Sequence, residues 1–244
     1  VKRTLAFTFT NKAADEMQTR LRALLGERST DIRTGTFHSI CYSILQEKHP
    51  ELNTIYDNEG REIILKMLFP EMKDTELKKL SKSLLKFFEL GNNSGIINIE
   101  HIAGLYREHN RKHNSIDLAD IINQTVRLLI DEQEFLEKVR DKYAAIAVDE
   151  FQDINPQQYR FIKLLASNKN ILAIGDPDQS IYGFRGSDVN LFFKFKEDFT
   201  AREINLEQNY RSSEIILKAA GDIIRNNTLK SNSLFLFSFY SSCC

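Results

Sequence analysis

Hydrophobic and polar positions follow three successive patterns along the chain. From residue 5 to about residue 46 they predict a strand, a helix, a short strand and a second helix. From about residue 47 to residue 141, apolar side chains recur at helical spacing and no strand signal interrupts them. Strands and helices alternate again from residue 143 to about residue 227. This order predicts an α/β fold class, in which an all-helical block is inserted between strands of a parallel sheet.

Two of the apolar runs end in acidic residues. The run 143–148 is followed by Asp149 and Glu150, and the run 170–175 is followed by Asp176. Continuous apolar strands are typical of a parallel sheet covered on both faces, where ligands bind beyond the carboxyl ends of the strands. Carboxylates at that edge can hold Mg²⁺ and activate water, although an exposed acidic loop would leave the same pattern.

Several features of the helices have simple structural interpretations. Asn11 is predicted to cap the first helix, whose apolar side carries Ala13, Ala14, Met17, Leu21 and Leu24. The lysine-rich segment 73–88 is amphipathic, and we expect its Leu and Phe side chains to pack within the helical block. His109 and His113 have the spacing of metal ligands, but the basic residues around them favour a solvated helix.

Composition adds a few limits. A chain of 244 residues with 42% hydrophobic residues can form one substantial core, or one core plus an inserted subdomain. The net charge of −1 indicates that any affinity for nucleic acid comes from local patches. Cys41, Cys243 and Cys244 form neither a disulfide framework nor a metal-binding pattern, which favours a reducing, cytoplasmic location. The longest apolar run, 234–240, is too short to span a membrane.

Five segments, in this order, resemble motifs of the UvrD/Rep/PcrA helicases, which are superfamily 1 motors that move along single-stranded DNA at the expense of ATP. Any one of them would be a weak signal, whereas five in the family's order are specific. They are Thr8-Phe9-Thr10-Asn11-Lys12-Ala13-Ala14 (motif Ia), Gly35-Thr36-Phe37-His38-Ser39 (Ib), Asp149-Glu150-Phe151-Gln152-Asp153 (II), residues 175–186 (III) and Leu206-Glu207-Gln208-Asn209-Tyr210-Arg211-Ser212 (IV).

The resemblance implies a RecA-like P-loop NTPase domain that uses ATP and Mg²⁺. Residues 1–46 would form the first part of domain 1A, 47–141 a helical 1B-like insertion, 142–207 the second part of 1A, and 208–244 motif IV and the start of domain 2A. The glycine-rich Walker A loop has no counterpart in this sequence, and neither have motifs V and VI. We therefore expect the chain to be a truncated helicase that does not hydrolyse ATP alone. The tail from about residue 231 is atypical for the family, and a frame change is one explanation.

The resemblance also implies functions in ATP hydrolysis for particular residues. Asp149 would hold Mg²⁺, and Glu150 would polarise the water that attacks the γ-phosphate. Gln179 would sense the γ-phosphate, because an amide can donate to a phosphate oxygen and lose that partner after hydrolysis. Tyr210 would pack on adenine, and Arg211 would stabilise charge on the γ-phosphate. Without the resemblance, Gln179 would be interpreted as a turn residue, and the last two as a helix cap and a surface ion pair.

A path for single-stranded DNA is implied as well. Tyr182 and Phe184, with Arg185 beside them, are flat side chains near a cation, on which unpaired bases can stack. Most family members carry Trp at the position of Phe184. Phe9 would face the DNA channel from the opposite side, although Phe9 and Phe37 also fit core positions. The sugar-phosphate path would be lined by Asn11, Thr36 and His38.

We therefore expect a piece of an ATP-dependent DNA helicase that translocates 3′ to 5′ on single-stranded DNA and acts at single-strand/duplex junctions in repair or replication. Two alternatives remain. The chain could be a non-catalytic module that binds DNA or protein partners, or part of a helicase-nuclease of the RecB/AddA type, which shares motifs II and III.

Overall fold

The chain forms two compact units. The computed structural model describes residues 3–91, 98–166, 170–183, 186–206 and 208–224, and the backbone of residues 234–239. The sheet unit comprises Val1–Thr36, Arg140–Ile154 and Ala166–Cys244, and the helical unit comprises Phe37–Val139 and Asn155–Leu165. The division into domains at residues 47, 142 and 208 stays a prediction.

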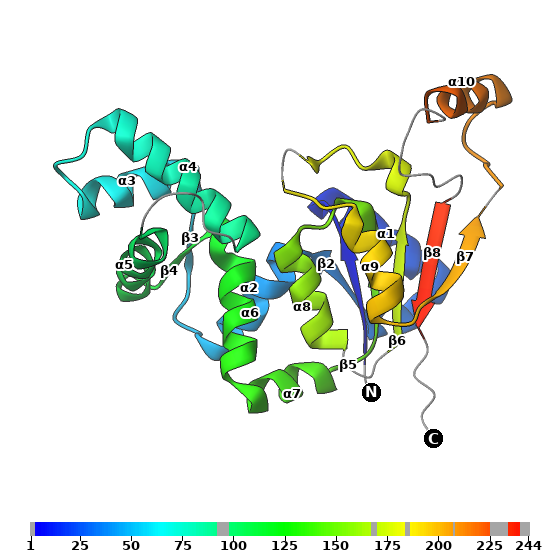
Figure 1. Ribbon diagram of the computed structural model, residues 1–244. Helices are drawn as coiled ribbons and strands as arrows, with labels where there is room; N and C mark the ends of the chain where they lie inside the picture. Colours follow the sequence, from blue (N-terminus) through cyan, green and yellow to red (C-terminus); the bar gives the residue numbers. More distant parts are fainter. Residues whose placement is uncertain are drawn as a thin grey trace. The chain divides into compact units, whose positions relative to one another are not determined.

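A six-stranded sheet organises the sheet unit, in the order β2-β1-β5-β6-β8-β7 (Figure 1). The first four of these strands run parallel, whereas β8 pairs antiparallel with both β6 and β7. This confirms the predicted α/β class with a parallel sheet. The bounds are β1 (Arg3–Thr8), β2 (Ile32–Thr36), β5 (Tyr143–Val148), β6 (Asn170–Gly175), β7 (Arg202–Leu206) and β8 (Leu234–Phe239).

Helices cover both faces of this sheet. The α1 helix (Asn11–Leu25) connects β1 to β2, and α9 (Asn190–Asp198) lies between β6 and β7 in the chain. In the strand order, the step from β1 to β2 and the step from β6 to β7 run in opposite directions. Right-handed crossovers therefore place α1 and α9 on opposite faces of the sheet, as Figure 1 shows. The strand residues Val148 and Ala173 are consequently buried. Short 3₁₀ helices add to the described part of this unit: η1 (Gly26–Asp31), η3 (Phe151–Asp153) and η4 (Pro177–Gln179).

The cap of α1 differs from the prediction. Thr10 is the capping residue, because its backbone is extended and its Oγ1 accepts a hydrogen bond from the Ala13 amide at 3.1 Å. Asn11 is the first helical residue, so the prediction that it caps the helix is wrong. Thr and Asn both satisfy the free amides at a helix start, and the sequence does not separate two adjacent candidates. Leu24, which was expected on the apolar side, is 80% exposed.

An aromatic cluster fixes the segment that follows β5. Phe151 of η3 is fully buried, and its ring packs edge-on against Phe195 of α9 at a centroid distance of 4.9 Å. Phe192 contacts the same ring at 6.0 Å. Edge-to-face aromatic pairs contribute about 0.5–1.5 kcal/mol beyond the area they bury. The cluster therefore ties the acidic segment after β5 to the helix that covers it.

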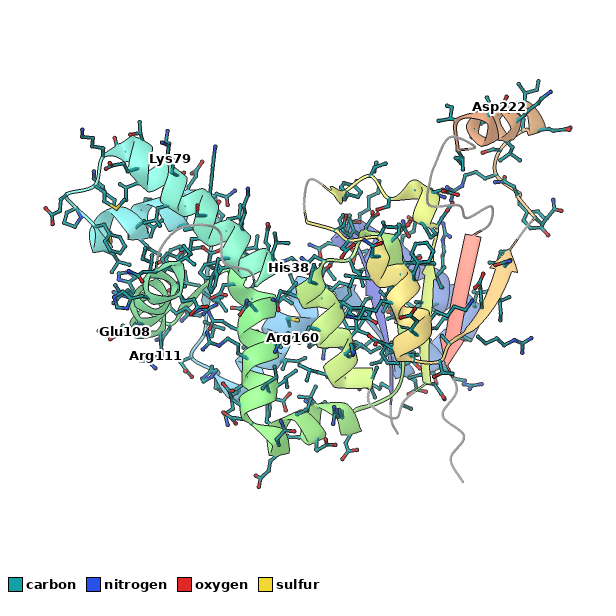
Figure 2. The ribbon with its side chains drawn as sticks, in the orientation of Figure 1. His38, Lys79, Glu108, Arg111, Arg160 and Asp222 are labelled. Atoms are coloured by element: carbon teal, nitrogen blue, oxygen red, sulfur yellow. The ribbon has the colours of Figure 1, made fainter. Side chains whose placement is uncertain are left out.

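The helical unit is built mainly from amphipathic helices. The predicted packing of segment 73–88 is confirmed, since Leu77, Leu80, Leu84 and Phe88 are buried while Lys79 projects outward (Figure 2). The helices of this part of the chain are α2 (Phe37–Lys48), α3 (Asn58–Leu68), α4 (Asp74–Leu90), α5 (Ile99–Lys112), η2 (Leu118–Asp120), α6 (Ile121–Asp131), α7 (Gln133–Asp141) and α8 (Pro156–Ala166).

Two short strands interrupt this series of helices. The segments β3 (Thr54–Tyr56) and β4 (Ser115–Asp117) pair in parallel as a two-stranded sheet. The expectation that no strand interrupts residues 47–141 is therefore wrong. Each strand has three residues, which is too short for a period-two pattern to be recognised in the sequence.

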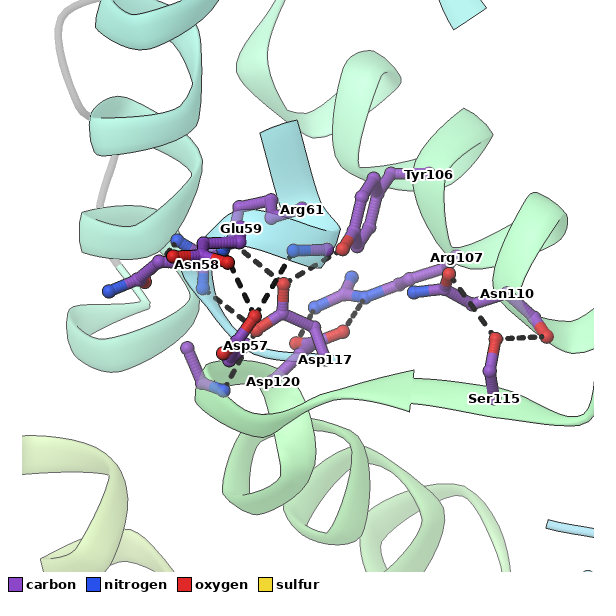
Figure 3. Close-up of polar contacts among 12 residues, drawn as sticks. Asp57, Asn58, Glu59, Arg61, Tyr106, Arg107, Asn110, Ser115, Asp117 and Asp120 are labelled. Carbon is purple, nitrogen blue, oxygen red and sulfur yellow. Dashed lines mark hydrogen bonds and ion pairs between the residues drawn. The ribbon is translucent and has the colours of Figure 1, made fainter. Parts of the chain in front are cut away.

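A buried polar network surrounds Asp117 at the end of β4 (Figure 3). The guanidinium of Arg61 donates to both carboxylate oxygens of Asp117, at 2.7 and 2.9 Å, and Tyr106 donates its hydroxyl to the same carboxylate at 2.8 Å. Arg61 and Asp117 are 2% and 0% exposed. Burial alone would lower the pKa of Arg61, but the hydrogen bond and the charge of Asp117 outweigh burial and raise it. The carboxylate thus compensates a charge that water does not reach.

Removing this carboxylate should strongly destabilise the helical unit. Asp117→Ala leaves the Arg61 charge buried without its partner, and breaking one side of a buried pair costs about 3–5 kcal/mol. The free energy of unfolding, measured by urea denaturation and followed by helical circular dichroism, should fall by that amount. The exposed residue Glu71 offers a matched control, since Glu71→Ala removes a carboxylate from the same unit. Equal stability of the two variants would contradict the prediction.

The last two described elements differ in their packing. The α10 helix (Glu214–Ile224) has no buried residue, and Figure 2 shows its side chains, Asp222 among them, projecting outward. In the tail, which was expected to be atypical, residues 234–239 form β8 between β6 and β7. No helix among the described residues is long and apolar enough to cross a membrane.

Candidate nucleotide and DNA site

Several of the predicted site residues lie at one edge of the sheet. Phe9 follows β1, Thr36 ends β2, Asp149 follows β5 and Asp176 follows β6. These four strands are parallel neighbours, so their carboxyl ends meet at the same edge. The chain direction across the sheet also changes between β1 and β5, which is where open α/β sheets bind ligands.

The two carboxylates after β5 have different surroundings. The Asp149 amide continues the ladder of β1 by donating to the Phe7 carbonyl at 3.0 Å, and the Asp149 side chain is half-buried. Burial, and then the charge of Glu150, raise the pKa of Asp149. Glu150 is exposed and has a left-handed backbone with φ 51°, which is uncommon for a residue other than glycine. This conformation turns the chain sharply from β5 into η3.

The Asp149 carboxylate is suited to Mg²⁺. Mg²⁺ is usually held by one or two carboxylates, with water and substrate phosphates completing its shell. The Asp149 carboxylate accepts a hydrogen bond from the Glu150 amide at 3.1 Å. Because burial and the charge of Glu150 raise the pKa of Asp149, a nearby cation would stabilise its ionised form. Among the residues that the structure describes, no group of three acidic, His or Cys side chains could hold a metal ion.

A hydrogen-bonded chain of side chains joins the loops after β5 and β6. Gln152 donates from Nε2 to Glu150 Oε2 at 2.8 Å and accepts at Oε1 from the Asp176 amide at 3.0 Å. The Asp176 carboxylate in turn accepts from Gln179 Nε2 at 2.7 Å. Two of the residues expected to act at the γ-phosphate, Glu150 and Gln179, are thus linked through Gln152 and Asp176.

One predicted aromatic pair is in direct contact. The rings of Phe9 and Tyr182 stack with their centroids 5.1 Å apart and an interplanar angle of 30°. Both rings are half-buried, so neither is a core residue. A base that stacked on both rings would have to separate them. The other two residues expected at this surface, Phe184 and Arg185, lie outside the described residues.

Comparison with known proteins identifies the family of this site. Residues 1–200 match the UvrD/REP helicase N-terminal domain. The chain belongs to the UvrD/REP helicase family. The ATP-dependent DNA helicase PcrA of Staphylococcus epidermidis is 36% identical over 245 residues, which cover 92% of this chain and 34% of that protein. PcrA of Staphylococcus aureus is similar to the same extent. The chain spans about a third of the length of these relatives.

The remaining residues expected at the DNA surface of this UvrD/REP helicase domain lie on different elements. Asn11 is exposed at the start of α1, and Thr36 is half-buried at the end of β2. His38 belongs to the helical unit, where burial lowers its pKa. Phe37 beside it is 5% exposed, which agrees with the alternative that this ring is a core residue.

Tyr210 and Arg211 lie in an exposed segment before α10. Tyr210 is 92% exposed. The Asn209 side chain accepts hydrogen bonds from the amides of Arg211 and Ser212, at 2.9 and 2.8 Å. This local turn fixes the backbone at the two residues. Within the described part of the chain, neither side chain contacts the carboxylates after β5, so the function of both residues in nucleotide binding stays a prediction.

The sequence interpretation did not assign a function to Gln152 or Gly175. Gln152 is 1% exposed, although it lies in a segment that looks like an acidic surface loop. A Cβ at Gly175 would lie 2.4 Å from Gln152 Oε1 and 2.9 Å from the Phe192 ring. A glutamine between two acids and a glycine before the next acid were the available signals, but their proximity depends on strand order.

The helical unit contains a cavity of about 700 Å³ that is not lined by the predicted site residues. Its lining includes Leu45, Gly104 and Arg111, and none of the predicted site residues.

Asp153 gives the site a measurable pH dependence. It is 8% exposed, and its Oδ1 has no hydrogen-bond partner among the described residues. Burial, and then the charge of Glu150, raise the pKa of Asp153 to about 6. An unfolded chain has an Asp pKa of about 3.9, so the folded carboxyl binds its proton more tightly. The stability from this proton is complete below about pH 4 and is lost as the pH rises through about 6.

Asp153→Asn should therefore stabilise the chain at neutral and alkaline pH. A neutral amide replaces the buried charge, so the gain in unfolding free energy over the parent should be largest at pH 8 and absent at pH 4. Urea denaturation at pH 4, 6 and 8 measures it, with Glu197→Gln on the exposed face of α9 as the control. A loss of stability at pH 8 would contradict this assignment.

Proposed function

We propose that this chain is part of an ATP-dependent DNA helicase that translocates 3′ to 5′ on single-stranded DNA and unwinds duplex DNA from single-strand/duplex junctions. The observation that carries this proposal is the hydrogen-bonded chain from Glu150 through Gln152 and Asp176 to Gln179, at the same sheet edge as Phe9 and Tyr182. The residues that would act on phosphate and those that would stack on bases belong to the same compact unit, which supports the proposal.

Different residues of the sheet unit would have different functions in ATP hydrolysis. Asp149 would hold Mg²⁺, which when bound neutralises charge on the phosphates. The exposed Glu150 would accept the proton of the attacking water through a carboxylate oxygen. Gln179 would exchange its bond to Asp176 for one to the γ-phosphate. Tyr210 would stack on adenine and Arg211 would contact the γ-phosphate, and both residues are exposed.

The DNA surface would lie beside this nucleotide site. Phe9 and Tyr182 would separate to accept bases, with Phe184 and Arg185 continuing the stack and Asn11, Thr36 and His38 along the backbone of the DNA. Stacking a base on an aromatic side chain is worth about 1–3 kcal/mol and tolerates any sequence. A cytoplasmic location and work in repair or replication agree with this activity, and no protein partner is proposed.

The direct test uses a completed helicase, defined as this chain joined to the flanking segments of the Staphylococcus epidermidis relative. It should release phosphate from ATP, single-stranded DNA should stimulate the release, and it should displace a strand from a duplex with a 3′ single-stranded tail but not a 5′ tail. The 244-residue chain alone should not hydrolyse ATP, because it has no Gly-Lys-Ser/Thr loop to cradle the β- and γ-phosphates.

The outcome separates the proposal from the alternative of a non-catalytic module. If the completed helicase folds and binds DNA but does not hydrolyse ATP, the chain is a non-catalytic binding module. Phosphate release by the 244-residue chain that single-stranded DNA stimulates would show that it binds nucleotide in another way.

A further inference from the structure

The side chain of Gln152 bridges two strand ends. Its Oε1 accepts from the backbone amide of Asp176 at 3.0 Å, and its Nε2 donates to Glu150 Oε2 at 2.8 Å and to Asp153 Oδ2 at 3.4 Å. In addition, the Ser180 hydroxyl donates to the Gln152 carbonyl at 3.3 Å. The loop after β5 is therefore connected to the loop after β6 by both the side chain and the backbone of one residue.

The orientation of the Gln152 amide follows from its partners. A backbone N–H can only donate, so the Asp176 amide must face the oxygen of Gln152. The nitrogen of Gln152 is then directed toward carboxylates, which can only accept when ionised. Rotating the amide by half a turn would place oxygen against oxygen and nitrogen against N–H. The network thus permits one orientation, and the 1% exposure of Gln152 leaves water little access to replace these bonds.

The backbone around Gln152 makes room for this arrangement. A Cβ on Gly175 would lie 2.4 Å from Gln152 Oε1, closer than non-bonded atoms can approach. Phe151, the neighbour of Gln152, is anchored in the aromatic cluster of α9. Gln152 is thus held on a rigid support, whereas Glu150 is exposed. An exposed glutamate has several rotamers, and a single well-supported donor selects among them.

We propose that Gln152 is a positioning residue for Glu150: its amide holds one carboxylate oxygen and leaves the other free to accept a proton from water. This inference rests on the proposed function, in which Glu150 is the general base. A base acts only when it lies within hydrogen-bond reach of the proton that it accepts, and a misplacement of about 1 Å can reduce the rate about 10²-fold. Gln152 itself neither gains nor loses a proton.

Two substitutions distinguish the bond to the Asp176 amide from the bond to Glu150. Gln152→Met has a similar length and removes all three side-chain bonds, including the one to Asp153. Gln152→Glu keeps an acceptor for the Asp176 amide but replaces the donor to Glu150 with a like charge. In the completed helicase, both should lower kcat for ATP hydrolysis by roughly 10- to 100-fold, with KM for ATP within about twofold of the parent because no nucleotide contact is removed. Gln18→Met, which removes a side-chain bond to Thr34 in the same unit, should leave kcat unchanged.

A double-mutant cycle tests whether Gln152 acts through Glu150. With Glu150→Gln already present, Gln152→Met should cause no further loss of kcat, since the group that it positions has gone. If Gln152→Met lowers kcat by the same factor in both backgrounds, or raises KM and leaves kcat unchanged, Gln152 does not position the base. A folded completed helicase with no hydrolysis overturns the proposed function instead, and this inference with it.

A stability measurement checks the contact without ATP. In the 244-residue chain, Gln152→Glu should lower the urea midpoint, because two carboxylates then face each other. Adding Glu150→Gln should recover part of the midpoint, since the exchanged pair again places a donor opposite an acceptor, while the carboxylate at position 152 still faces Asp153. If the single and double variants unfold at the same midpoint, the bond between positions 150 and 152 is absent and the inference is wrong.

Discussion

Replacing Glu150 with glutamine in the completed helicase is expected to abolish most ATP hydrolysis while ATP still binds. The substitution preserves size, and the side-chain carbonyl of the introduced glutamine can still accept the bond from Gln152 Nε2 that Glu150 Oε2 accepts now at 2.8 Å. Only the ability to take a proton from water is lost. General-base catalysis contributes roughly 10²- to 10⁴-fold, so kcat should fall by that factor. Single-turnover phosphate release and a fluorescent-ATP titration measure the two effects separately.

A charge control is needed because the site contains several acids. Glu197→Gln removes one carboxylate from α9 in the same unit, where the side chain is exposed. It should leave kcat and ATP affinity unchanged. If Glu150→Gln hydrolyses ATP within a few-fold of the parent, Glu150 is not the base. The inference that Gln152 positions the base is then wrong as well.

The strand ends could be predicted from the sequence because burial on both faces leaves a continuous apolar run. Val148 and Ala173 are fully buried, and the acids that follow them lie at the carboxyl edge as expected. Motif order then identified the family, which the match over residues 1–200 confirms. The apolar runs and the motifs each consist of residues that are close together in the chain, so one sequence is enough to recognise them.

Features that depend on strand order could not be predicted in this way. Gln152 and Asp176 are separated by more than twenty residues, and their hydrogen bond exists because β5 and β6 are neighbours in the sheet. The stacking of Phe9 on Tyr182 likewise joins loops that are far apart in the sequence. The short strands β3 and β4 escaped detection for another reason, since three residues give no periodicity. At the start of α1, Thr10 and Asn11 were equally good caps by residue type.

Arg211 should have the largest effect of any single residue on hydrolysis. In the completed helicase, Arg211→Ala should reduce kcat roughly 10³- to 10⁵-fold, as when an arginine that stabilises transition-state charge is withdrawn from phosphoryl transfer. The affinity for single-stranded DNA without nucleotide should stay close to the parent. Arg202→Ala is the matched control, because Arg202 is an exposed arginine of β7 in the same unit. Steady-state hydrolysis and DNA anisotropy provide the two measurements.

Arg211→Lys distinguishes charge from geometry at this position. Lysine retains the positive charge but lacks the planar, two-pronged donor of arginine, so it should restore only part of the lost rate. The Asn209 side chain bonds the backbone amide of residue 211 and not its side chain, so neither substitution should disturb the local turn. If Arg211→Ala hydrolyses ATP normally but binds single-stranded DNA poorly, Arg211 belongs to the DNA surface. The nucleotide assignment of residues 209–212 would then have to be withdrawn, because Tyr210 was assigned to adenine on the same grounds.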